Sequence, residues 1–282
     1  MGMTSLVSQV EKIYRHSRQG SIGTRREYRK CMLRFVNWLE LEYNMQNLRN
    51  ISNKHLAEYV RDRVSNGNSP GYIMKDLSAI RYYHDQLLKP RYQLERENSK
   101  LGVPEKVSPG NRAWTEDEYN LLCALAVESG SEWIADVLIL LRELGCRIHE
   151  IIRLDTVAME RGLRNGFLEV KGKGGKHRTI VLTSEAVEAL CRARARVKRG
   201  AKLFVPETRK SHRVISDVQK FIRENRPERT GEQLTPHGLR YKYAQKRMGK
   251  LLSDGSTREK AEKIVSRELG HERRRVVRGY LG

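Results

Sequence analysis

Apolar residues recur at helical spacing through most of the first 90 residues. Residues 1–22 show little periodicity, so no regular element is predicted for them. The spacing predicts a first helix over residues 24–41, with Thr24 as its N-cap and Glu27 completing a capping box. A second helix is expected to begin after Ser52.

A turn and a third helix follow. The composition of residues 65–71, SNGNSPG, is typical of a turn. The helix after it is expected to close at Lys89 and Pro90. Its apolar face consists of Ile73, Leu77, Ile80, Tyr83 and Leu87. The first 93 residues therefore predict a compact all-helical domain.

A polar stretch with two prolines and two glycines, residues 94–112, is typical of a linker. Thr115 is predicted to cap the helix that follows, because acidic residues fill the first turn after it. A strongly apolar helix is predicted over residues 133–144, ending at Gly145, and helical spacing resumes over residues 147–154.

The spacing of apolar residues then changes from a helical period to the pattern typical of strands. Residues 167–170 and 179–182 predict two short strands, and KGKGGK between them, residues 171–176, predicts a hairpin turn because glycine adopts positive φ at little cost. Helical spacing returns from Ser184 to the end. The fold class predicted is mainly α with a small antiparallel β-sheet. Its parts are an all-α domain over 1–93, a linker over 94–112 and a larger α+β domain over 113–282.

Composition narrows the class of protein. The longest apolar run, Leu121–Val127, is far too short to span a membrane, and the first residues lack the pattern of a signal peptide. We therefore expect a cytoplasmic protein without membrane association. The cysteines are scattered singly, so no CxxC pair supports a zinc ribbon or a disulfide framework. We expect small buried apolar residues at Cys31, Cys123, Cys146 and Cys191.

The chain carries a formal net charge of +21, with 55 basic and 34 acidic side chains. Residues 1–110 hold 19 of the basic and 11 of the acidic ones, so both halves share the excess. A basic folded chain indicates a polyanionic partner, most commonly nucleic acid. Residues 192–202 contain six basic residues and no acid. This run either lines a phosphate backbone or forms a solvated helix face.

Four segments of the second domain hold residues suited to phosphodiester chemistry: LGCRIHEI (144–151), VKGKGGKHRTIVL (170–182), HGLR (237–240) and LGHERRRVVRGY (269–280). Cleavage of DNA without a metal needs positive groups on the non-bridging oxygens, and arginine forks supply them. It also needs a proton donor for the leaving oxygen, which a lysine can be, and a nucleophile such as tyrosine.

The order and spacing of these segments resemble the tyrosine recombinase (phage integrase) family. That family shows a "TGxRxxE" box, a hairpin of type "GKGxKxR", an "HxLR" box, and "LGH" followed by a tyrosine nine residues beyond its histidine. The matching residues here are Leu144–Glu150, Gly172–Arg178, His237–Arg240, Leu269–His271 and Tyr280. The resemblance covers nearly the whole chain, and the N-terminal helices are similar to the family's SAM-like core-binding domain.

The resemblance implies a role for each residue. Tyr280 would be the nucleophile that becomes joined to the 3′ phosphate, and Arg147 and Arg240 would clamp the scissile phosphate. Glu150 would orient Arg147, because a carboxylate facing the phosphate would repel it.

Proton transfer falls to the remaining residues of the four boxes. Lys173 would protonate the departing 5′ oxygen, with Lys176 as the second choice because the alignment can slip across a glycine-rich turn. His237 would act as acid/base and phosphate donor, and His271 as a second histidine at the phosphate.

The resemblance further implies strand exchange on double-stranded DNA by a homotetramer, one dimer on each of two sites, with no metal, cofactor or ATP. An accessory DNA-bending or directionality protein is a candidate partner.

The chain departs from the family in having Tyr241 after the "HxLR" box and Arg273–Arg275 in the last box. Only two residues follow Tyr280, so we expect either a truncated chain or a different coupling between protomers. The absence of an arm-binding domain favours a simple two-domain recombinase.

Two other functions remain open at this stage. A type IB-like topoisomerase would use the same residues to relax DNA without a defined site. A non-catalytic DNA-binding protein, acting as an accessory factor, would have lost one of the boxes, whereas all four are present here.

Overall fold

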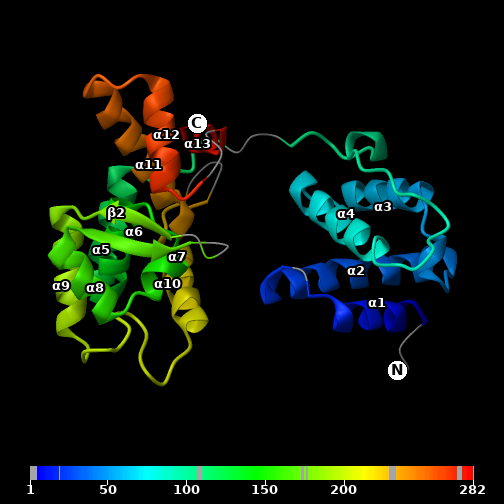
Figure 1. Ribbon diagram of the computed structural model, residues 1–282, viewed down its shortest axis with the longest axis horizontal. Helices are drawn as coiled ribbons and strands as arrows, with labels where there is room; N and C mark the ends of the chain where they lie inside the picture. The colour runs from blue at the N-terminus through cyan, green and yellow to red at the C-terminus, as the bar shows by residue number, and fades with distance from the viewer. Residues whose placement is uncertain are drawn as a thin grey trace. The chain divides into compact units, whose positions relative to one another are not determined.

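The computed structural model describes residues 5–18, 20–106, 110–172, 175, 177–228, 233–271 and 275–281. The chain divides into two compact units, Met1–Ser108 and Pro109–Gly282, shown in Figure 1 in blue to cyan and in green to red. The described residues are mainly helical and form one two-stranded antiparallel sheet, so the predicted fold class is confirmed. In the described part of the chain, no helix combines the length and the apolar character that crossing a membrane requires.

The first unit is built on four helices: α1 (Ser5–His16), α2 (Ile22–Tyr43), α3 (Asn53–Ser65) and α4 (Pro70–His84). Helix α2 packs against α1 and α4. The core contains a cluster of aromatic rings in which Phe35 and Trp38 both contact Tyr59. Ser52 is the N-cap of α3, as predicted.

Three predictions for the first unit are wrong in detail. Helix α1 forms where no element was expected, because Leu6 and Val10 are buried in the core and Val7, Ile13 and Tyr14 pack against it. Ser21 caps α2 in place of Thr24, since its hydroxyl accepts the Thr24 amide proton. Helix α4 ends at His84, so Leu87 lies beyond it.

The predicted linker is partly built into the first unit. Leu94, Leu101 and Val103 are buried in its core, and residues Ser99–Leu101 form a 3₁₀ turn. The composition of residues 94–112 concealed this because three apolar side chains are spread among many polar ones.

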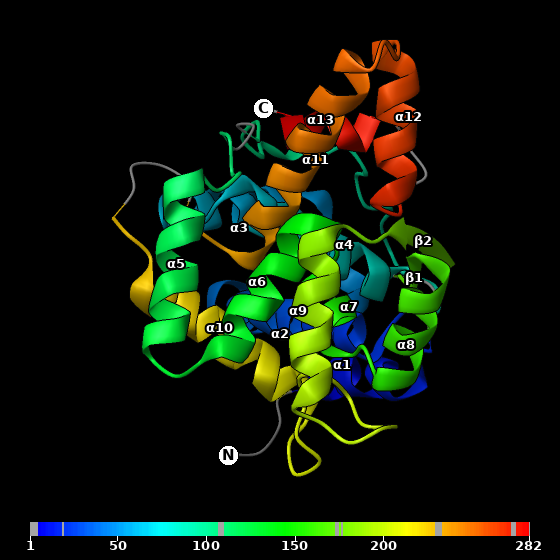
Figure 2. The same ribbon diagram turned by 90° about the vertical axis from the view of Figure 1, so that its left-hand side faces the viewer.

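The second unit consists of helices and the hairpin of β1 (Phe167–Lys171) and β2 (His177–Val181), which lies at the edge of the unit in Figure 2. The register pairs Phe167 with Val181 and Lys171 with His177. The helices are α5 (Glu116–Glu128), α6 (Glu132–Leu144), α7 (Ile148–Ile152), α8 (Thr156–Asn165), α9 (Ser184–Ala195), α10 (Ser211–Asn225), α11 (Pro236–Ser253), α12 (Arg258–Glu268) and α13 (Arg275–Leu281). Figure 2 shows α6 beside α9, with which it packs closely.

Local signals place these elements where the sequence predicts them. Thr115 caps α5 through a capping box with Glu118. Gly145 ends α6 in the left-handed conformation. The cysteines correspond only in part: Cys31 and Cys146 are buried, whereas Cys123 is half-buried and Cys191 is exposed, and all four are free thiols.

The second unit has two hydrophobic clusters. The larger, which we call the main core, contains residues of α5 to α10 together with Leu239 of α11. The smaller, which we call the C-terminal core, is formed mostly by α11, α12 and α13 and contains Ala244, Val265, Val277 and Tyr280. Helix α11 therefore contributes to both clusters.

Candidate active site

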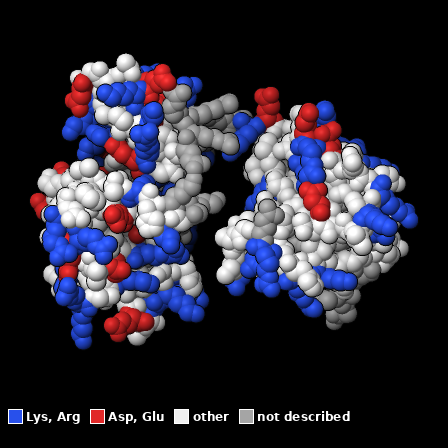
Figure 3. Space-filling view, in the orientation of Figure 1, with Lys and Arg blue, Asp and Glu red and all other residues white. Residues whose placement is uncertain are grey.

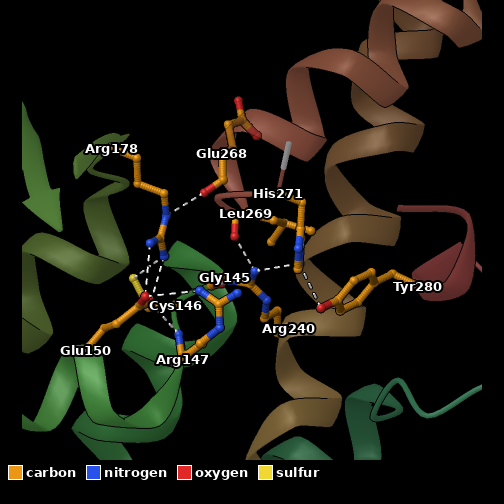
Figure 4. A network of polar contacts seen from close by, with 10 residues as sticks. All are labelled: Gly145, Cys146, Arg147, Glu150, Arg178, Arg240, Glu268, Leu269, His271 and Tyr280. Carbon is orange, nitrogen blue, oxygen red and sulfur yellow. Dashed lines mark hydrogen bonds and ion pairs between the residues drawn. The ribbon is translucent and has the colours of Figure 1, made fainter. Parts of the chain in front are cut away.

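Predicted site residues from three of the four segments meet in the second unit, where α7, α11, α12 and α13 approach one another (Figure 4). Arg147 precedes α7, His237 and Arg240 lie in the first turns of α11, and His271 and Tyr280 come from the last segment. Lys173 and Lys176, the two candidate proton donors, lie outside the described residues.

Arg240 is fully buried and holds the site together. Its Nη1 donates to the carbonyl oxygen of Gly145 at 2.5 Å, and its Nη2 donates to the carbonyl oxygen of Leu269. The same Nη2 lies 3.1 Å from Nε2 of His271. Arg240 thus joins the end of α6 to the end of α12. Burial lowers the pKa of its guanidinium.

The Nε2 atom of His271 also lies 3.1 Å from the hydroxyl oxygen of Tyr280. Burial, followed by the charges of Arg240 and Arg147, lowers the pKa of His271 to about 4. The imidazole is therefore neutral near pH 7. Because Arg240 can only donate, Nε2 is the unprotonated nitrogen that accepts, and it can accept the Tyr280 proton too.

His237 lies beside the same tyrosine. Its ring centroid is 5.7 Å from that of Tyr280 and 5.5 Å from that of Tyr241. Burial, then Arg240 and Arg147, lowers the pKa of His237 to about 4. Both histidines are consequently uncharged at neutral pH.

Glu150 contacts Arg147, as the sequence predicts. Its carboxylate accepts from the Arg147 backbone N–H at 2.7 Å and from Arg147 Nη1 at 3.2 Å. Burial acts to raise the pKa of Glu150, but the hydrogen bonds from Arg178 and from the Arg147 backbone outweigh it and hold the pKa at about 2. Glu150 is thus a carboxylate at any working pH.

Arg178 was given no role from the sequence, yet it links the hairpin segment to Glu150 and to the end of α12. Its two Nη atoms donate to Glu150 at 3.0 and 2.7 Å, and its Nε donates to the carbonyl oxygen of Glu268 at 2.9 Å (Figure 4). The sequence did hold a signal for this residue. Side chains alternate between the two faces of a strand, so Arg178 lies on the same face of β2 as the buried Ile180.

Two glycines allow the close approaches in the site. Gly145 has φ +57, and a Cβ there would lie 2.4 Å from the ring of Tyr243. Gly270 has φ +67 and lets the chain turn after α12, where the His271 N–H donates to the Ser266 carbonyl at 2.8 Å. These turns present the carbonyl groups that Arg240 binds.

The basic side chains of residues 192–202 lie mostly at the surface, which fits a solvated face, and several of them pair with acids. That the run lines a phosphate backbone stays a prediction. Arg192 and Arg196 both bind the buried carboxylate of Asp136, and Arg194 and Arg199 bind Glu160. Other basic side chains lie over the visible surface of each unit (Figure 3).

Arg273 and Arg274 lie outside the described residues, as does the side chain of Arg275. Within the described ranges, His, Cys, Asp and Glu side chains form no group that could hold a metal ion.

Comparison with known proteins identifies the class that this fold and site define. Residues 112–281 match the model of the phage integrase family, and residues 11–90 match the phage integrase N-terminal SAM-like domain. The chain belongs to the phage integrase family of tyrosine recombinases, which are DNA strand-exchange enzymes.

Curated relatives carry the same family name. The chain is 26% identical over 206 residues to tyrosine recombinase XerD of Caulobacter vibrioides, covering 67% of this chain and 66% of that protein. It is 32% identical over 187 residues to tyrosine recombinase XerC of Azotobacter vinelandii, covering 63% and 60%. The matched region thus spans less than two thirds of the length of either relative.

Solved structures share the fold. A lambda integrase dimer bound to a COC′ core site has a TM-score of 0.73 at 18% identity, covering 99% of this chain and 96% of that one. A Tn1549 transposon integrase in complex with circular intermediate DNA has a TM-score of 0.69 at 15% identity, covering 100% and 96%. A lambda integrase tetramer bound to a Holliday junction has a TM-score of 0.71 at 16% identity, covering 98% and 76%.

Proposed function

We propose that this protein is a site-specific recombinase that cuts and rejoins double-stranded DNA through a 3′-phosphotyrosine at Tyr280. The observation that carries the proposal is the contact of the Tyr280 hydroxyl with a neutral, accepting imidazole, His271, which is itself bound to the buried Arg240. A nucleophile, its base and a phosphate-binding cation stand together within hydrogen-bond distance.

In the cleavage step, the Tyr280 hydroxyl gives its proton to His271 while its oxygen attacks the phosphorus. The bond from phosphorus to the 5′ oxygen breaks, and Lys173, or Lys176 in its place, protonates that oxygen. Arg147 and Arg240 hold the non-bridging oxygens, where charge gathers in the transition state. His237, expected from the sequence to be both acid/base and phosphate donor, donates to the same phosphate from its N–H, while His271 takes the tyrosine proton because it contacts the hydroxyl.

Rejoining is the reverse step with a different strand. The 5′ hydroxyl of a partner strand gives its proton to the lysine that lost one in the cleavage step, and its oxygen attacks the phosphorus. The bond from phosphorus to the Tyr280 oxygen breaks, and Tyr280 leaves with a proton from His271. One phosphodiester is broken for each one made, so the reaction needs no ATP. Neither step as written draws on a metal or a cofactor.

The proposed partners follow from this chemistry. Two DNA sites are each held by a dimer, and the resulting tetramer resembles the lambda integrase tetramer on a Holliday junction. Both the first unit and the second unit bind the DNA. Such an enzyme would serve a mobile element or the resolution of a replicon in the bacterial cytoplasm, with an accessory protein to bias direction.

Covalent trapping tests the proposal. The protein is mixed with DNA spanning the ends of its native genetic locus, denatured with detergent and examined for a protein–DNA adduct. We expect an adduct at one position, and none with Tyr280→Phe, which should still bind DNA. Adducts spread over any plasmid would instead indicate a type IB-like topoisomerase. Tight binding and unchanged biological activity in Tyr280→Phe would indicate a non-catalytic DNA-binding protein.

A further inference from the structure

Gln245, in the middle of α11, touches the backbone of the nucleophile. Its Nε2 donates to the carbonyl oxygen of Tyr280 at 3.1 Å and to Oδ1 of Asn111 at 2.9 Å. An amide NH₂ has two protons, so both bonds can form at once. Asn111 Oδ1 also accepts from the Ala113 N–H at 3.0 Å, which fixes the direction of the Asn111 side chain.

The partner of Gln245 belongs to residues 110–114, by which the chain enters the second unit and which we call the lead-in segment. Ala113 is buried in the C-terminal core together with Tyr280. Trp114 donates from Nε1 to the Thr235 carbonyl at 2.9 Å, just before the HGLR box. A Cβ on Gly238 would lie 2.4 Å from the Arg112 carbonyl oxygen. The lead-in segment is therefore packed against two parts of the site.

Helix α13 depends on such contacts for its position. It has seven residues, Arg275–Leu281, and a helix this short is not stable by itself. Its last carbonyl groups have no partner within the helix, and that of Tyr280 is one of them. Among the described contacts of α13, Val277 anchors it in the C-terminal core and Arg278 binds Glu262 at 3.3 Å. Gln245 binds the backbone carbonyl of Tyr280.

We propose that Gln245 is a positioning residue for the nucleophile. It holds the Tyr280 carbonyl beside the lead-in segment. Because the tyrosine side chain is stiff, a fixed backbone also fixes the hydroxyl beside His271. This inference rests on the proposed function, because it assumes that Tyr280 attacks the phosphate. Gln245 lies away from the reacting atoms and acts only through Tyr280.

The consequence is a rate effect without a binding effect. A displacement of about 1 Å from the attack geometry can cost about 10²-fold in rate. Removing the Gln245 donor leaves every phosphate-binding side chain in place. The loss should therefore appear in the maximal cleavage rate and not in the DNA concentration that gives half of that rate.

The experiment is single-turnover cleavage of a duplex nicked close to the cut position found by covalent trapping. The nick lets the short cut fragment diffuse away, so that the adduct accumulates. Gln245→Met keeps the length and neutrality of the side chain but donates no hydrogen bond. We expect it to lower the maximal rate at least about 10-fold at unchanged half-saturating DNA concentration. Asn111→Asp, which still accepts both bonds, is the matched control and should cleave at nearly the wild-type rate.

Gln245→Glu gives a second test if Gln245→Met unfolds, because its carboxylate also lacks the donors and thermal unfolding reports its fold. Folded variants that cleave as fast as the wild type would overturn the inference alone. Equal losses in Gln245→Met and Asn111→Asp would overturn it too, since the hydrogen bond would then not be the cause. A wild-type protein that forms no adduct would overturn the proposed function, and this inference with it.

Discussion

The hydroxyl oxygen of Tyr280 lies 3.1 Å from Nε2 of His271, the residue that begins the loop leading to its helix. That nitrogen can receive the tyrosine proton only while the imidazole is neutral. Burial and the nearby Arg240 keep it neutral by disfavouring the charged form. The arginine that would hold the phosphate thus also prepares the base.

The lowered pKa values predict how the free protein responds to acid. Histidine free in an unfolded chain has a pKa near 6.5, whereas burial and then Arg240 lower the pKa of His271 and of His237 to about 4. Between these values the unfolded chain binds more protons than the folded one. The free energy of unfolding should therefore fall as the pH drops from about 6.5 towards 4. Glu150 adds to the loss at lower pH, below its unfolded pKa of about 4.3.

NMR titration of the histidine ring protons checks this directly. We expect both midpoints below pH 5 without DNA, and higher midpoints once a phosphate is bound, because an anion favours the imidazolium. A midpoint for His271 near 6.5 in the free protein would contradict the role assigned to burial and Arg240.

The two arginines should differ in what their loss does to the fold. Arg240→Ala leaves the buried carbonyl groups of Gly145 and Leu269 without their donor, at about 1–3 kcal/mol for each. Arg147→Ala removes a partly exposed side chain, and Arg178 still holds Glu150. Both changes should lower the cleavage rate by about 10²–10³-fold or more. Urea unfolding should show a marked loss of stability for Arg240→Ala alone.

Arg178 should prove necessary for the geometry of the site. Arg178→Met leaves the buried Glu150 carboxylate short of a partner, which typically costs about 3–5 kcal/mol. Arg178→Lys keeps the charge but cannot bind Glu150 and the Glu268 carbonyl together, so we expect better stability and still slow cleavage. A double-mutant cycle with Glu150→Leu should give a coupling of about 1–3 kcal/mol. Additive effects would show that the pair contributes nothing.

Replacing each of two glycines by alanine should change the stability of the protein in opposite directions. Gly270→Ala places a Cβ at φ +67 and 3.2 Å from Cδ of Arg178, so we expect a loss of roughly 1–2 kcal/mol and slower cleavage. Gly249→Ala, inside α11 with nothing within 4 Å of the new Cβ, should gain about 0.4–1 kcal/mol and leave cleavage unchanged. Thermal unfolding of both variants measures the difference. A stabilised Gly270→Ala variant would contradict the described turn.

The paired arginines after α9 should contribute more to folding than to DNA binding. Arg196 binds the buried Asp136, so Arg196→Gln should lower stability. A side chain that neutralises a phosphate changes the slope of log K against log salt by about 0.9. We expect a slope unchanged from that of the wild type. Fluorescence anisotropy over a series of salt concentrations would detect a loss of that size, which would mean that Arg196 also reaches the DNA.

The local features of the fold and the order of the four boxes along the chain could be predicted from the sequence. Thr115, Gly145 and the glycine-rich hairpin are set by short-range rules of capping and turns. Helix α1 does carry a helical period, since Leu6, Val10, Ile13 and Tyr14 all contact the core, so the expectation of little periodicity in residues 1–22 was wrong. Ser21 and Thr24 are both good caps, so only the packing of α2 decides between them.

The contacts of the site depend on distant segments meeting. Arg240 was predicted to clamp a phosphate, but its bonds to two backbone carbonyl groups arise from the way α6, α11 and α12 cross. Gln245 is part of no box, and nothing in its neighbourhood in the sequence distinguishes it. Its importance becomes visible only when Asn111 and Tyr280 are brought to the same amide.

The separation of the second unit into two hydrophobic clusters has a consequence for how activity is lost. Tyr280 belongs to the small C-terminal core, while Cys146, next to Arg147, lies in the main core. A small cluster buries less apolar surface and opens at lower free energy than a large one, which amide exchange would register as an early loss of protection in α12 and α13. Mild denaturant would then separate the nucleophile from the arginines while most of the chain stays folded, and removing the denaturant would restore the enzyme without a cycle of complete refolding.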